Sequence, residues 1–201
     1  MTTKTKKLNS RIIKNFGSKR VFPYQFAFTL LIPLRNIFPS PKKLISRLEL
    51  KEDSIVLEIG PGPGFFSLKI AEYLSRGKLI LADIQQEMLD YAKRRITKKG
   101  IQNVEYYLCN GISLDFDNES FDFVIMVTVF GEVENKEKYL EEIYRILKIG
   151  GTLSITELAG DPDRMTIEQI EEMICEKGFA RKIIHGNKKN YTINFVKSSG
   201  V

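Results

Sequence analysis

Three alternating glycines form the sequence feature with the clearest chemical use. Gly60, Gly62 and Gly64 directly follow the apolar run at 55–59, and a segment with helical spacing comes next. Glycine has no Cβ atom, so such a turn lets a ligand lie against bare backbone, while the N–H groups of the following helix point at it. The pattern predicts a turn that binds a nucleotide-like molecule. The alternative is a glycine-rich connection without a ligand.

The spacing of this turn separates it from two common phosphate-binding motifs. A nicotinamide dinucleotide motif, G-x-G-x-x-G, needs a small residue where Phe65 stands, and a P-loop needs Gly-Lys-Ser/Thr where Phe65-Phe66 stands. The G-x-G-x-G pattern instead fits a nucleoside that carries an amino-acid tail rather than a pyrophosphate.

Asp83 is the second candidate binding residue. It ends the apolar run at 78–83, 19 positions after Gly64, where an acid can accept hydrogen bonds from both hydroxyls of a ribose. An acid there predicts an unphosphorylated ribose. A helix N-cap is the alternative role for an aspartate at this place, but the nearby glycine turn favours ribose recognition.

The elements that must position these residues alternate between strands and helices. Short apolar runs predict strands at 55–59, 78–83, 104–108, 121–127 and 151–157, and helical spacing predicts helices at 65–75, 86–98, 136–147 and 166–177. Segments 180–184 and 191–196 flank a polar turn at 186–190, which predicts an antiparallel hairpin. The fold class is therefore α/β, a Rossmann-like, seven-stranded, mostly parallel sheet with helices on both faces and a C-terminal antiparallel hairpin.

Length and charge divide the chain into an arm and one domain. A length of 201 residues, with 43% hydrophobic and 28% charged residues, matches a single globular domain. Residues 1–53 carry a net charge of +9 and the remainder −3. We expect a basic N-terminal arm and possible active-site lid at 1–40 and the main domain at 41–201. The aromatic segment 20–35 could instead make peripheral membrane contact.

Several function classes are excluded by what the sequence lacks. The apolar stretch at 21–34 falls short of the ~18 clean residues of a membrane span, and the basic N-terminus lacks the pattern of a secretory signal, so we expect a cytoplasmic protein. Cys109 and Cys175 are too few and too far apart for a disulfide framework or a metal site, and His185 is the only histidine. No metal site is predicted.

These motifs, taken in order, resemble those of the class I S-adenosylmethionine-dependent methyltransferases. The likeness covers Glu58 to Gly64, Leu81-Ala82-Asp83-Ile84, Cys109-Asn110-Gly111-Ile112, the run at 121–125, and the segment at 147–153, where Ile149 replaces the proline of an L-K-P-G-G turn. Within the family, the chain looks most like small methyltransferases related to the C-methyltransferases of quinone biosynthesis.

The resemblance implies S-adenosyl-L-methionine as the cofactor, S-adenosyl-L-homocysteine as its product, and a set of binding residues. The glycines would contact the methionine and the ribose, Glu58 would orient the amino group and Asp83 would hold the ribose. The full implied set is Glu58, Gly60, Gly62, Gly64, Phe65, Asp83, Ile84, Met88, Asn110, Gly111, Ile112 and Val127. Ile84 and Met88 would enclose the adenine with Ile112. Asn110 stands where the family usually has aspartate, and an amide can also meet the adenine edge.

The catalytic residue is not assigned by the sequence. The loop at 127–133 should line the methyl-transfer site, because ligands of open α/β sheets gather at the carboxyl ends of the strands. Relatives often have histidine at the position of Gly131, so the polar candidates left are Glu132, Tyr24 and Tyr107. Each of the three is more often structural, and positioning with water exclusion could suffice without a base.

The acceptor is predicted to be a small molecule or lipid-like. Methylases that act on nucleic-acid bases typically carry an Asn/Asp-Pro-Pro-Tyr run after the fourth strand, whereas this chain has Val127-Thr128-Val129-Phe130 there. Nucleic acid is therefore a less favoured partner, and the sequence does not give the oligomeric state. The alternatives are an RNA- or protein-directed methyltransferase and a non-catalytic cofactor-binding module that uses the basic arm.

Overall fold

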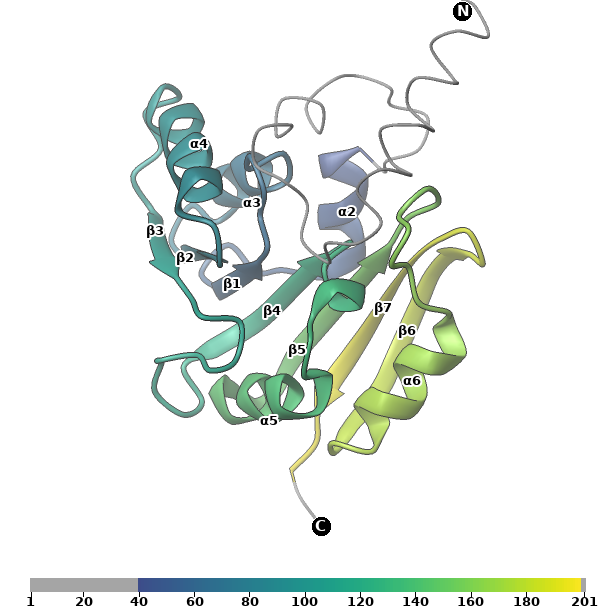
Figure 1. The fold of residues 1–201 in the computed structure, drawn as a ribbon. Helices are drawn as coiled ribbons and strands as arrows, with labels where there is room; N and C mark the ends of the chain where they lie inside the picture. The colour runs from purple at the N-terminus through teal and green to yellow at the C-terminus, as the bar shows by residue number, and fades with distance from the viewer. Residues whose placement is uncertain (1–39, 200–201) are drawn as a thin grey trace, which may run out of the picture.

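The computed structural model describes residues 40–199, which form one seven-stranded sheet with helices on both faces (Figure 1). The strands are β1 (Ile55–Ile59), β2 (Lys78–Asp83), β3 (Val104–Leu108), β4 (Phe121–Val127), β5 (Leu147–Glu157), β6 (Phe179–Asn187) and β7 (Asn190–Lys197). Their order is β3-β2-β1-β4-β5-β7-β6. The first five strands pair in parallel, and β7 pairs antiparallel with β5 and β6. The fold class predicted from the sequence is confirmed.

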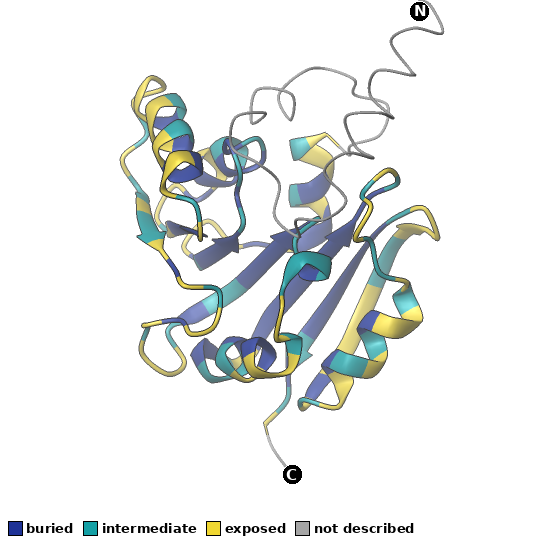
Figure 2. Ribbon diagram, in the orientation of Figure 1, coloured by how far each residue is buried: buried dark blue, intermediate teal, exposed yellow. Residues whose placement is uncertain are grey.

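Two layers of helices enclose the sheet. They are α2 (Pro41–Leu48), α3 (Ser67–Tyr73), α4 (Gln86–Thr97), α5 (Lys136–Ile146) and α6 (Ile167–Cys175), with a short 3-10 helix, η2 (Phe130–Glu132), after β4. Apolar residues of α2, α3 and α4 form one core against the sheet, and those of α5 and α6 form another on the opposite face. Strand β4 serves both cores, because Val124 and Met126 face one while Ile125 and Val127 face the other. The central strands are accordingly buried (Figure 2).

Side chains and a glycine fix the ends of two helices. Ser40 caps α2 through a bond from the Lys43 N–H (3.2 Å), and Thr166 and Gln169 form a capping box at the start of α6. Gly178 follows α6 with φ +87°, the left-handed conformation expected of a C-terminal glycine.

Strand β5 differs from the expected one. It begins at Leu147, where the sequence predicted the end of a helix, and it contains the glycine pair read as a turn. Phe121 pairs with Leu147 and Phe123 with Thr152, so the extra residues of β5 bulge out of the ladder. Gly150 takes φ +76° within this bulge. The hairpin also runs further than predicted, because β6 and β7 close through a turn of only Lys188 and Lys189.

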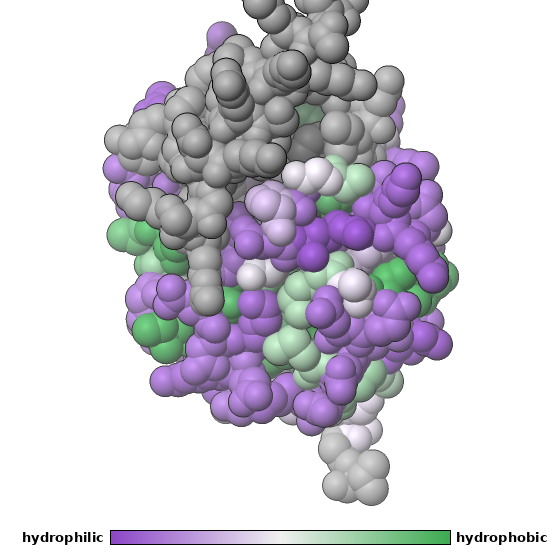
Figure 3. Space-filling model, turned by 45° about the vertical axis from the view of Figure 1, so that its right-hand side comes forward, coloured by the Kyte–Doolittle hydropathy of each residue, from purple (hydrophilic) through white to green (hydrophobic). Residues whose placement is uncertain are grey.

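The predicted arm at 1–40, apart from Ser40, lies outside the described residues, and so do Tyr24 and the segment 20–35. No helix within residues 40–199 is long and apolar enough to cross a membrane. The face of the domain seen in Figure 3 is largely hydrophilic, with hydrophobic residues showing only in small areas.

Candidate functional site

The glycine turn lies at the carboxyl end of β1 and is shaped by close backbone contacts. Gly60 has φ +64°, and its N–H donates to the Ala82 carbonyl of the neighbouring strand (2.8 Å). A Cβ atom at this position would lie 2.5 Å from Cγ2 of Val129, so the close approach of the loop after β4 requires glycine. NH1 of Arg95 on α4 holds the far end of the turn through the Pro63 carbonyl (2.6 Å). The turn is thus fixed by strand β2, by helix α4 and by the loop after β4.

Asp83 is tied to this turn at the end of β2. Its side chain is 7% exposed, and Oδ1 accepts a hydrogen bond from the Gln85 N–H (2.9 Å). Burial raises the pKa of Asp83 to about 6, while the N–H groups of Gln85, Gly62 and Ile84 lower it. The N-cap residue of α4 is Gln85, so the capping alternative for Asp83 does not describe its place.

Glu58 is a buried acid next to the turn, 2% exposed. Burial raises the pKa of Glu58 to about 7, and the nearby Ser67 hydroxyl partly lowers it. Neither Oε2 of Glu58 nor Oγ of Ser67 has a hydrogen-bond partner at a regular distance and angle within residues 40–199. A buried polar atom without a partner is costly, so this carboxylate could serve an ammonium group placed at the turn.

Two exposed isoleucines lie near Asp83, one directly after it and one in the loop after β3. Ile84 is 45% and Ile112 is 51% exposed, whereas Met88 is buried. A Cβ atom on Gly111, which has φ +73°, would lie 3.4 Å from Cγ2 of Ile84, so this loop and the end of β2 are in contact. Ile84 and Ile112 could enclose a flat ring, and Met88 lies buried in the first turn of α4, four residues after Ile84.

Asn110 shapes the loop that carries Ile112. Its Oδ1 accepts bonds from the N–H groups of Ile112 and Ser113, both at 2.9 Å, and its Nδ2 donates to Oγ of Ser113 (3.1 Å). The side chain therefore fixes its own loop, because both polar atoms of the amide expected at the adenine edge are bonded within that loop.

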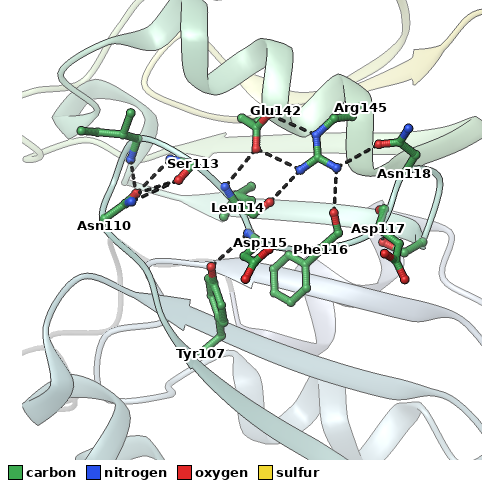
Figure 4. A network of polar contacts seen from close by, with 12 residues as sticks. Tyr107, Asn110, Ser113, Leu114, Asp115, Phe116, Asp117, Asn118, Glu142 and Arg145 are labelled. Atoms are coloured by element: carbon green, nitrogen blue, oxygen red, sulfur yellow. Dashed lines mark hydrogen bonds and ion pairs between the residues drawn. The ribbon is translucent and has the colours of Figure 1, made fainter.

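An arginine on α5 anchors the rest of this loop (Figure 4). Arg145 donates to the carbonyls of Leu114 and Phe116, both at 2.7 Å, and to Oδ1 of Asn118 (2.9 Å). Glu142 pairs with Arg145 (2.9 Å) and accepts from the Leu114 N–H (3.0 Å). Sequence reasoning missed this pair, because nothing local links α5 to residues 110–118.

Tyr107 belongs to the same anchoring network. Its hydroxyl accepts a hydrogen bond from the Asp115 N–H (3.0 Å), and its ring packs against Phe116. Among the weak catalytic candidates, Tyr107 thus has a structural role in the described loop.

The loop after β4 forms the other end of the site. Val127 is buried at the end of the strand, and Thr128 has φ +54°, a conformation that costs a β-branched residue energy and often marks a functional site. A Cβ atom on Gly131 would lie 2.0 Å from the Asp163 carbonyl oxygen. The loop between β5 and α6 therefore lies directly against Gly131 and leaves no room for a side chain there.

Glu132 lies in η2 among acidic groups. Burial, together with the charges of Asp161, Asp163 and Asp83, raises the pKa of Glu132 to about 8. Glu157, at the end of β5, is fully buried and was missed in the sequence analysis. Its signal was the one used for Asp83, an acid that ends an apolar strand. No group of three or more His, Cys, Asp or Glu within residues 40–199 could hold a metal ion.

Fold and site together define the class I fold of S-adenosylmethionine-dependent methyltransferases, with a glycine turn after β1 and an acid at the end of β2. Residues 50–196 match the sequence model of a family described as "Methyltransferase domain". The chain belongs to this methyltransferase family, whose cofactor is S-adenosylmethionine.

Comparison with individual proteins gives the same class. The chain is 35% identical over 112 residues to the ubiquinone/menaquinone biosynthesis C-methyltransferase UbiE of Hydrogenovibrio crunogenus, which covers 55% of this chain and 44% of the relative. The UbiE protein of Marinomonas is 31% identical over 63% of this chain and 51% of its own length. The chain spans about half the length of the curated relatives it matches.

A solved structure covers more of the chain. A SAM-dependent methyltransferase from Aquifex aeolicus superimposes with a TM-score of 0.81 over 88% of this chain and all of its own, at 23% identity. At that identity the likeness concerns the fold.

Proposed function

We propose that the chain transfers the methyl group of S-adenosylmethionine to a small, lipid-like acceptor with a phenolic ring. The observation that carries the cofactor half is the buried, unpartnered Oε2 of Glu58 beside the bare backbone of Gly60 to Gly64. This pairing suits the ammonium group of an amino acid joined to a nucleoside, whose ribose would meet Asp83.

Each remaining binding residue has a proposed task. Ile84, Met88 and Ile112 enclose the adenine, and Asn110 holds the loop whose Gly111 approaches the adenine edge. Phe65, against Phe66, and Val127 close the apolar sides of the turn. These assignments rest on the contacts described above.

The acceptor class is proposed from the relatives together with the chemistry of transfer. The relatives are named as C-methyltransferases of ubiquinone and menaquinone biosynthesis, and phenolic rings are the acceptors that this name suggests. When bound, the cofactor supplies a methyl group on a positively charged sulfur. The residues of the turn and of the loop after β4 then have to align the acceptor and exclude water.

Binding and methyl-transfer measurements test the proposal. Isothermal titration calorimetry should detect binding of both S-adenosylmethionine and S-adenosylhomocysteine to the protein. Methyl release should then occur on dimethylhydroquinone, which leaves ring carbons free, and not on phosphatidylethanolamine vesicles or on tRNA. Turnover only on tRNA or vesicles would replace the acceptor class. Binding without turnover would favour a non-catalytic module, and no binding of either nucleoside would refute the proposal.

The cytoplasmic location and the peripheral membrane contact of residues 20–35 stay predictions, as do the roles of the N-terminal arm and of Tyr24. Flotation of the full chain with liposomes, compared with a chain that lacks residues 1–39, would test the membrane contact.

A further inference from the structure

Glu157 ends β5 as a fully buried acid, 0% exposed, whose two carboxylate oxygens have no hydrogen-bond partner within residues 40–199. Leaving a buried polar group unpaired costs about 1–3 kcal/mol, and more for a charged one. The domain therefore holds an acid that destabilises it unless another molecule supplies a partner.

The side chains around Glu157 donate their hydrogen bonds elsewhere. Nζ of Lys136 donates to two backbone carbonyls of the η2 segment (2.9 and 2.7 Å), and NH1 of Arg164 donates to a carbonyl in the β6–β7 turn (2.5 Å). Tyr191, which lies opposite Glu157 on β7, donates its hydroxyl to the Met165 carbonyl. Both oxygens of Glu157 are therefore left without a donor among the described residues.

Glu157 also lies next to the segment that contacts the glycine turn. The Thr128 N–H donates to the Thr156 carbonyl (2.8 Å), so the residue after Thr156 is alongside the chain leaving β4. One residue further, Val129 packs on Gly60. Glu157 is thus at the end of the site where a methyl acceptor would meet the cofactor.

The charges facing Glu157 suit a group that accepts a proton near neutral pH. Burial raises the pKa of Glu157 to about 8, and the charges of Asp161 in the next loop and of Glu132 in η2 raise it too. Arg164 and Lys136 act in the opposite direction. A carboxylate with such surroundings can take a proton from a weak acid, as an effective general base must.

We propose that Glu157 accepts a hydrogen bond, and then the proton, from a hydroxyl group of the acceptor. This inference rests on the proposed function and deepens it. As the hydroxyl proton passes to the carboxylate, a ring carbon forms a bond to the methyl group, and the methyl–sulfur bond breaks with its electron pair left on sulfur. The hydrogen on that carbon then leaves to water as a proton, and Glu157 returns its own proton to the ring oxygen.

Two substitutions separate this role from a structural one. Glu157→Gln keeps the shape but cannot accept the proton, and Glu157→Leu removes every polar atom. Because both abolish an unpartnered buried carboxyl, we expect melting temperatures at or above that of the wild type. Dimethylhydroquinone methylation should nevertheless fall by about 10²–10⁴-fold in both variants. The matched control is Glu171→Gln, which removes a carboxylate on α6 that pairs with Arg181 (2.7 Å). This variant should keep wild-type activity.

Binding without turnover supplies the second measurement. In the protein loaded with S-adenosylhomocysteine, affinity for dimethylhydroquinone should rise as the pH passes about 8, the pKa of Glu157, and dimethylbenzoquinone, which has no hydroxyl donor, should show no such rise. Glu157→Gln should abolish the rise.

The outcomes decide between the two proposals. If the wild type methylates the hydroquinone but the Glu157 variants match the control in rate and pH profile, this inference is wrong and the proposed function stands. Variants that do not fold, or that melt lower with an unchanged pH profile, would assign Glu157 a structural role and overturn it. A wild type that methylates no phenolic ring refutes the proposed function, and the inference with it.

Discussion

The pH dependence of nucleoside binding tests the role proposed for Asp83. Burial raises the pKa of this carboxyl to about 6, even though the N–H groups of Gln85, Gly62 and Ile84 lower it. Two ribose hydroxyls would donate to the ionised form, so binding at low pH must first remove a proton. We therefore expect nucleoside affinity to weaken as the pH falls through about 6.

The size of the effect follows from that pKa. At pH 5, about one carboxyl in eleven is ionised, which predicts about tenfold weaker binding than at pH 8. The stability of the free protein should move the other way. Because the pKa of Asp83 is raised from 3.8 to about 6 on folding, the folded chain holds an extra proton between these values. The free energy of unfolding that Asp83 contributes is therefore lost as the pH rises through about 6.

Isothermal titration calorimetry with methylthioadenosine is the suitable assay. This nucleoside has the ribose and the sulfur but lacks the amino-acid tail with its ammonium group, so Glu58, whose pKa is raised to about 7, does not add a second pH dependence. Asp83→Asn should bind about 10- to 100-fold more weakly at pH 8, through loss of a charge-assisted bond of about 1.5–3 kcal/mol, and with no fall towards pH 5. Asp90→Asn, on the exposed side of α4, is the control. A flat wild-type profile, or the same fall in Asp83→Asn, would refute the ribose assignment.

Three further substitutions test the packing of the site. Gly60→Ala should lower the free energy of unfolding in urea by about 2–5 kcal/mol, because it adds strain at φ +64° and a clash with the Val129 side chain. The control Gly100→Ala has a similar φ of +71° but nothing within 4 Å, so it should lower the free energy of unfolding by only about 1–2 kcal/mol. Equal losses would contradict the clash. Gly131→Ala should lower the free energy of unfolding by about 1–3 kcal/mol and speed amide hydrogen exchange at 158–165, because the new Cβ would displace Asp163. Unchanged exchange would show that this loop does not pack against Gly131. Arg145→Gln should speed amide hydrogen exchange at 110–118 and weaken S-adenosylhomocysteine binding about 3- to 10-fold. The lost hydrogen bonds hold the adenine loop in place without touching the ligand. Unaltered affinity would show that this anchor does not contribute to binding.

The cofactor half of the site could be predicted because its signals are local. Gly60 to Gly64 and Asp83 lie directly at strand ends, so the order of strands and helices fixes their positions. The predicted start of β5 at residue 151 was wrong because it, too, was taken from local signals alone. Gly150 and Gly151 look like a turn within the sequence, and only the pairing of Phe121 with Leu147 shows them as a bulge inside a strand.

The contacts that hold the loops around the site could not be predicted, because no local sequence pattern links their partners. The partner of the Tyr107 hydroxyl is a backbone N–H in the next loop, and Gly131 is dictated by a carbonyl 32 positions further along the chain, that of Asp163. Glu142 and Arg145 form hydrogen bonds with Leu114, which precedes them by 28 and 31 positions. No periodicity or motif contains such pairings.

Three acids stand at or next to the carboxyl ends of strands that share one edge of the sheet, namely Glu58, Asp83 and Glu157. Asp83 is held by backbone N–H groups, whereas one carboxylate oxygen of Glu58 and both of Glu157 have no hydrogen-bond partner among the described residues. At the end of β2 the edge is therefore built in advance, whereas Glu58 is left to be completed by the cofactor and Glu157, beyond β4, by the acceptor. It follows that a relative with the same glycine turn and Asp83, but an apolar residue in place of Glu157, should bind the cofactor equally well and methylate an acceptor without an acidic hydroxyl.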